Sequence, residues 1–95
     1  MMFGEEKYEV VPSKNFFKEL SKLSTEDQDR VKEVLDIMRI DPFYLSLRTK
    51  KVHKLFESSV NMDIRIFWRF RGSQIIAALN VGHHDVIRKY NKHKF

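Results

Sequence analysis

The last thirteen residues of the chain, 83–95, contain three of its four histidines, four of its eighteen lysines and arginines, and a single acidic residue. Histidine can donate or accept a proton near neutral pH, while lysine and arginine bind phosphate oxygens. This segment follows residues 74–82, an apolar run that ends in a glycine and predicts a buried strand. Side chains at the end of a rigid strand are held in place, so this end of the chain is a candidate site for phosphate chemistry.

The charge is divided unevenly along the chain. Residues 1–41 carry seven basic and ten acidic residues, a balance of −3, whereas residues 42–95 carry eleven basic and three acidic residues, a balance of +8. A basic region of this size, with Phe, Tyr and Trp interleaved, favours a polyanion such as nucleic acid as the partner. The alternative is the ordinary uneven surface of a small domain that binds no polyanion.

Length and composition indicate a single domain over residues 1–95, with room for one modest core. The hydrophobic content of 42% is sufficient for a folded chain, and without cysteine neither a disulfide nor a thiolate metal site can form. The acidic first residues do not resemble a signal peptide, and no apolar run approaches the roughly 20 residues of a membrane span. We therefore expect a cytoplasmic protein with no membrane partner.

The acidic half predicts a short strand and two helices. Residues 8–11 alternate in character and stop at Pro12, which is typical of a short strand. Ser13 can cap a first helix, and Ser24 or Thr25 can cap a second one that ends at residues 41–42, an Asp-Pro pair. Because almost no loop separates the helices, we expect an antiparallel hairpin whose apolar stripes cover one face of a sheet.

The basic half predicts strands over residues 52–56, 64–70 and 74–81. The expected fold class is α+β, with an N-terminal strand and the helical hairpin packed on one face of a curved, mainly antiparallel sheet. In the central strand, alternation assigns Ile64, Ile66, Trp68 and Phe70 to the core against Phe16 and Leu35. Arg65, Arg69 and Arg71 then point to the opposite face, which we expect to collect basic side chains.

Three motifs occur in a fixed order after the helices: residues 47–55 (LRTKKVHKL), residues 61–68 (NMDIRIFW) and residues 81–86 (VGHHDV). Together with the strand and helical hairpin before them, they resemble the RelE/ParE toxin superfamily over about residues 8–90. The resemblance implies a toxin of a type II toxin–antitoxin pair. RelE-like members cut messenger RNA in the ribosomal A site without a metal, whereas ParE-like members poison DNA gyrase.

The resemblance implies that Arg65 is the strand arginine that holds the scissile phosphate, and that His84 and Lys54 complete the catalytic set. Histidine suits the transfer of a proton to or from the reacting oxygens, because its charge changes near neutral pH. His83 and His84 point to opposite faces of an extended segment, so their roles could be exchanged. The alternative for Arg65 is an ordinary exposed strand arginine, and for residues 48–54 a solvated basic surface.

The remaining candidates are side chains expected to bind RNA. One of them is aromatic and could stack on a nucleobase. They are Lys51, His53, Arg69, Arg71, His83, Arg88 and Tyr90. No metal site or cofactor is expected, because adjacent histidines diverge and no ordered set of further ligands is present. The implied partners are an acidic antitoxin, the ribosome and messenger RNA. Three functions stay open: a ribosome-dependent messenger RNA endonuclease, a gyrase inhibitor, and a non-toxic binding protein of the same fold.

Overall fold

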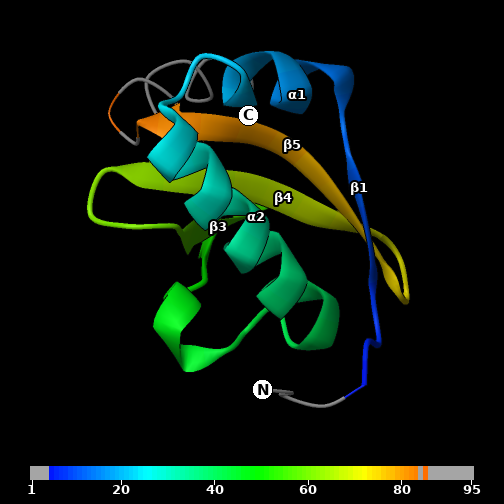
Figure 1. Ribbon diagram of the computed structural model, residues 1–95. Coiled ribbons are helices and arrows are strands. Elements are labelled where there is room, and N and C mark those ends of the chain that lie inside the picture. The colour runs from blue at the N-terminus through cyan, green and yellow to red at the C-terminus, as the bar shows by residue number, and fades with distance from the viewer. Residues whose placement is uncertain (1–4, 84, 86–95) are drawn as a thin grey trace.

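The computed structural model describes residues 5–83 and 85, and Figure 1 shows their arrangement. The elements in chain order are β1 (Glu9–Pro12), α1 (Lys14–Leu20), α2 (Thr25–Ile40), a 3₁₀ turn η1 (Leu45–Leu47), β2 (Lys50–Val52), β3 (Leu55–Ser59), β4 (Ile64–Gly72) and β5 (Ile75–His83). The five strands form one sheet in the order β1-β5-β4-β3-β2. Only the β1–β5 pair among these strands is parallel. The predicted α+β class is confirmed.

Both predicted helix starts are confirmed by hydrogen bonds. The Ser13 hydroxyl accepts from the Phe16 amide at 3.0 Å, and the Ser24 hydroxyl accepts from the Asp27 amide at 3.1 Å. These caps satisfy amides of the first turn that have no partner inside the helix. Ser24, rather than Thr25, is therefore the cap of α2, which ends at Ile40 immediately before the Asp-Pro pair.

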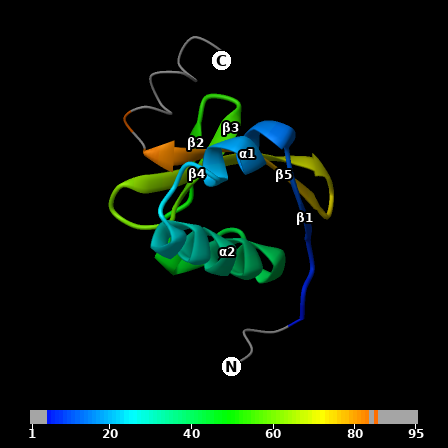
Figure 2. The ribbon, with the colours of Figure 1, turned by 45° about the horizontal axis from the view of Figure 1, so that its top comes forward.

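A single core joins both helices to one face of the sheet. Helix α2 forms a separate layer along the strands (Figure 1), and the turned view shows that layer more clearly (Figure 2). Phe16 of α1 and Val34 of α2 belong to the same buried cluster as Ile66 and Trp68 of β4. The Trp68 indole nitrogen donates to the Ser58 hydroxyl at 2.8 Å, so its one polar atom is satisfied in the core. The predicted core assignment of β4 is confirmed.

The opposite face of the sheet is not only basic. Leu55 and Phe67 are buried there, with the partly buried Val52 and Leu79 packed against them. Phe67 lies between Arg65 and Arg69 in the same alternation, so a small apolar cluster interrupts the expected stripe of arginines. The expectation that this face collects basic side chains is therefore correct only at its two ends.

The prediction of one strand over residues 52–56 is wrong, because the chain reverses within that range. β2 and β3 form an antiparallel hairpin in which Val52 pairs with Leu55, and His53 and Lys54 make the turn. His53 has a φ of 57°, in the left-handed region. The usual markers of such turns are Gly, Asn and Asp, and none of them is present here, which explains why the turn escaped prediction.

Within residues 5–83 and 85, none of the helices combines the length and the apolar character that a membrane span requires. The same residues contain no group of three or more His, Asp or Glu side chains placed to hold a metal ion.

Candidate active site

Arg65 lies at the end of the sheet where β3 turns into β4. It pairs with Ser59 of β3 and Gly82 of β5, and its side chain is directed to the face opposite the helices. That side chain is only 19% exposed. The alternative of an ordinary exposed strand arginine therefore does not describe its environment.

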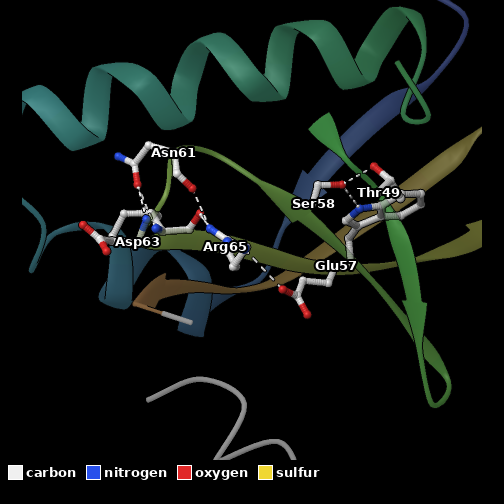
Figure 3. Close-up of polar contacts among 8 residues, drawn as sticks. Thr49, Glu57, Ser58, Asn61, Asp63 and Arg65 are labelled. Carbon is white, nitrogen blue, oxygen red and sulfur yellow. Dashed lines mark hydrogen bonds and ion pairs between the residues drawn. The ribbon is translucent and has the colours of Figure 1, made fainter. Parts of the chain in front are cut away.

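Glu57 is the partner of Arg65. The arginine Nε lies 3.3 Å from Glu57 Oε2, the ion pair drawn in Figure 3. The glutamate side chain is 2% exposed. Removing a carboxylate from water is costly unless a cation and hydrogen-bond donors compensate it. Arg65 contributes the cation. The pair therefore places a carboxylate, which can accept a proton, beside a guanidinium, which can bind phosphate.

The β3–β4 turn holds Arg65 in place. Arg65 Nη1 donates to the backbone carbonyl of Asn61, and also to that of Ile64 at 3.1 Å (Figure 3). The Asn61 side-chain oxygen accepts from the amides of Asp63 and Ile64, each at 2.8 Å. Its amide nitrogen donates to Asp27 of α2 at 3.2 Å. The turn, the guanidinium and the helix are thus connected, which limits the freedom of the arginine.

Four of the predicted site residues lie at the other end of the sheet from Arg65. Because Phe56 pairs with Trp68, the β2–β3 turn with His53 and Lys54 is close to Arg69. Lys54 is five residues from Ser59, the partner of Arg65, which corresponds to about 16 Å along β3. Arg69 is about 13 Å from Arg65 along β4 by the same rise, and the exposed Arg71 lies beyond it. The structure does not bring Lys54 to Arg65.

Strand register also separates Lys51 and His83 from the Arg65 face. Lys51 pairs with Phe56 and its ammonium lies 5.8 Å from the centroid of that ring, on the helix side of the sheet. His83 pairs with Ile64, a core residue, and lines a cavity of about 430 Å³ on the same side. Lys50, in contrast, pairs with Glu57 and shares its face. The lysine of β2 on the candidate site is therefore Lys50.

Three predicted site residues, His84, Arg88 and Tyr90, lie outside the residues that the structure describes. Their proposed roles stay predictions.

Glu57 is the functional candidate that sequence reasoning missed. A single glutamate in the run 55–59 is an ordinary observation, and its importance depends on the register that places it beside Phe67 and near Arg65. The available signal was its position as the first acid after a long basic stretch. An acid that interrupts such a stretch inside a strand deserves comparison with the arginines of the neighbouring strand.

Arg65→Ala is expected to lower the free energy of unfolding by about 3 kcal/mol, because it removes the guanidinium that lies 3.3 Å from the buried Glu57 carboxylate. Alternation in the sequence places Arg65 outside the helix-facing core, so this stability cost follows from the ion pair and not from core packing. Urea unfolding followed by circular dichroism measures the difference. Arg69→Ala is the matched control, because Arg69 is exposed and should change stability by no more than about 0.5 kcal/mol. Equal stability of the two variants would contradict the structural importance of the pair.

No protein-family model and no curated protein matches the sequence. Several solved structures match the fold. A chain of the archaeal RelE–RelB complex from Pyrococcus horikoshii matches with a TM-score of 0.72 at 20% identity, covering 81% of this chain and 94% of that chain. A chain of the RelB–RelE antitoxin–toxin complex from Methanococcus jannaschii matches with a TM-score of 0.69 at 20% identity, covering 84% and 96%.

YafQ from E. coli, which also occurs in a DinJ–YafQ toxin–antitoxin complex, matches with a TM-score of 0.71 at 10% identity, covering 84% of this chain and 97% of that chain. Identities of 10–20% establish similarity of fold. The chain therefore has the RelE-like toxin fold, as the three sequence motifs predicted.

Proposed function

We propose that this protein is the toxin of a type II toxin–antitoxin pair and that it inhibits translation by cutting messenger RNA on the ribosome. The observation that carries the proposal is the Glu57–Arg65 pair, a desolvated carboxylate held against a guanidinium on the sheet face opposite the helices. Cleavage by the adjacent 2′-hydroxyl requires a proton acceptor, a cation for the developing charge and a proton donor. The pair supplies the first two.

Each group has a defined role in the proposed reaction. Glu57 accepts the proton of the 2′-hydroxyl, whose oxygen attacks phosphorus. Nη2 of Arg65 has no partner among the described residues and binds a non-bridging oxygen as its charge grows. The bond from phosphorus to the 5′-oxygen breaks, and His84 donates a proton to that leaving oxygen. The products are a 2′,3′-cyclic phosphate and a 5′-hydroxyl end, and the reaction needs no metal because Arg65 provides the positive charge.

His84 is proposed in preference to His83 because His83 lies on the helix side of the sheet. Lys54 is proposed to bind RNA and not to take part in catalysis, because about 16 Å of strand separates it from Arg65. With Arg69 and Lys50 it would hold phosphates of the same RNA strand along the sheet. Such contacts position the backbone and carry little sequence information.

An acidic antitoxin is the proposed partner, and the proposed substrate places its action in the cytoplasm. The matched RelE and YafQ structures include complexes with RelB and DinJ. The balance of +8 over residues 42–95 favours an acidic segment that covers this region. A neighbouring reading frame should therefore encode a small acidic protein whose co-expression relieves growth arrest.

Induced expression in a bacterium, followed by mapping of messenger RNA 5′ ends, tests the proposal. The wild-type chain should stop growth and create new ends within translated codons. His84→Ala should create none, whereas His83→Ala should retain them, because only the first of these histidines is assigned to the reaction. Each variant replaces one histidine by alanine at adjacent positions. A difference between them therefore shows which imidazole takes part in the reaction.

Three results would contradict the proposal in different ways. Growth arrest with intact messages would favour a gyrase inhibitor. The absence of arrest would favour a non-toxic binding protein. New ends that persist in His84→Ala and disappear in His83→Ala would support a nuclease in which His83, not His84, donates the proton.

A further inference from the structure

A basic cavity lies beside the Glu57–Arg65 pair, at the end of the sheet where β3 turns into β4. Its volume is about 320 Å³, and the polar residues that line it are three arginines, two serines and an asparagine: Arg30, Arg48, Arg65, Ser46, Ser59 and Asn61. None of the described residues in its wall is acidic. Met62, which is 86% exposed, adds an apolar side chain to the wall. The cavity is thus suited to an anion that carries an apolar group.

The cationic and hydroxyl groups of this cavity are available to a ligand. Arg48 makes no side-chain hydrogen bond or ion pair with the described part of the chain. The same holds, among residues 5–83 and 85, for the hydroxyls of Ser46 and Ser59. Arg30 is 3.0 Å from Glu33, but both side chains are more than half exposed, so a ligand can replace this contact with little loss.

Arg48 has a backbone conformation that an arginine rarely adopts. Its φ of 48° and ψ of 42° are left-handed, and glycine would adopt them without strain. The next residue fixes this geometry. The Thr49 hydroxyl donates to the Pro42 carbonyl at 2.7 Å, and it lies 2.6 Å from the Ser58 hydroxyl, a contact visible in Figure 3. Strained backbone that the surroundings maintain is concentrated at functional sites. An arginine at this position indicates a use for its side chain.

We propose that the cavity binds a phosphate group of RNA, next to the phosphate that reacts at Glu57. Guanidinium forks and hydroxyls match the oxygens of phosphate, and three arginines around one cavity favour a highly charged oxyanion. Arg65 contacts Glu57 through Nε and the wall of the cavity through the Asn61 carbonyl, so it belongs to both sites. An RNA strand can therefore place consecutive phosphates in the two sites. This inference rests on the proposed RNA substrate, but not on its cleavage.

The test uses the full chain and a 2′-O-methyl oligoribonucleotide, which has the phosphates of RNA but no attacking hydroxyl. Fluorescence anisotropy gives the affinity as a function of salt concentration. Arg48→Gln should weaken binding about tenfold and reduce the salt slope by about 0.7, the value for one lost phosphate contact on a single strand. Lys32→Gln removes the same charge from the exposed surface of α2 outside the cavity, and should leave both quantities unchanged.

A second variant separates binding from folding. Arg48→Gly relieves the left-handed strain while it removes the guanidinium, so its Tm should rise although its RNA affinity falls as in Arg48→Gln. Inorganic phosphate should shift the amide NMR signals of Ser46 and Ser59 in the wild-type chain, and not in either variant. These results together would support a phosphate site whose arginine is retained at a cost in stability.

The failures of this proposal and of the proposed nuclease are distinguishable. If Arg48→Gln keeps the wild-type salt slope while the wild-type chain cuts messages, the phosphate site is rejected and the nuclease stands. If the slope falls as expected but no message is cut, the nuclease is rejected and the phosphate site stands. If Arg48→Gln weakens binding of the antitoxin and leaves the RNA slope unchanged, the cavity is a site for an acidic peptide and the RNA proposal is overturned.

Discussion

Glu57→Gln is expected to reduce the rate of messenger RNA cleavage by about 10²- to 10⁴-fold, the usual contribution of a positioned general base. Glutamine preserves the size of the side chain and can still accept a hydrogen bond from Arg65, which lies 3.3 Å away. It cannot take a proton from the 2′-hydroxyl. Arg65 keeps its contacts to the Asn61 and Ile64 carbonyls, so the guanidinium should remain in place and the loss should be one of chemistry.

Cleavage of a ribosome-bound message by purified protein measures this rate directly. Glu9→Gln is the matched control, because it makes the same chemical change at an exposed position of β1, the strand at the opposite edge of the sheet from β2. The control should cleave at the wild-type rate. If Glu57→Gln also cleaves within twofold of wild type, Glu57 has only a structural role and another group must accept the proton.

Both helices and the two long strands of this fold could be predicted because local signals specify them, whereas the β2–β3 hairpin could not. Ser13 and Ser24 each cap a helix by accepting a hydrogen bond from the amide three residues further along the chain, so the signal is local. The strand around Trp68 is evident from alternation that continues over Ile64–Gly72. Interactions between near neighbours in sequence are visible without a structure, and they determine which segments are helices and strands.

The composition of the candidate site could not be predicted to the same extent, because it depends on strand register. One residue of shift moves a side chain to the other face of a sheet. The turn at His53 and Lys54 lacks the usual turn residues, and without it neither the pairing of Lys50 with Glu57 nor that of Ser59 with Arg65 can be inferred. Sequence reasoning therefore selected Lys51 and Lys54, whereas the pairing places Lys50 on the candidate site.

The candidate site also stabilises the end of the sheet where β3 turns into β4. Arg65, Glu57 and the Asn61 turn are connected by hydrogen bonds and an ion pair, and Asn61 reaches Asp27 of α2. A substitution at Arg65 therefore changes both folding and chemistry, and loss of growth arrest alone cannot distinguish them. Arg65→Lys, which retains the charge without the bidentate fork, should preserve more stability than alanine while still weakening phosphate binding.

Val34→Asp is expected to abolish cooperative folding at 25 °C. Val34 is 4% exposed in the core cluster that α2 shares with β4 and β5. An aspartate there would place a carboxylate among apolar side chains, with no cation in that cluster to compensate it. The cost is expected to be at least about 4 kcal/mol, which is comparable with the whole stability of a small domain.

Urea unfolding by circular dichroism, with Lys32→Asp as the control, tests this packing. Lys32 is two residues away on the exposed side of the same helix. Lys32→Asp therefore introduces an aspartate into α2 without burying its carboxylate. The control should lose no more than about 1 kcal/mol, because helix propensity and surface charge are its only costs. A cooperative transition in Val34→Asp close to that of Lys32→Asp would mean that α2 does not close the core. In that case the contact between Asp27 and Asn61 could not hold the turn that positions Arg65, and the account of the candidate site would fail together with the packing.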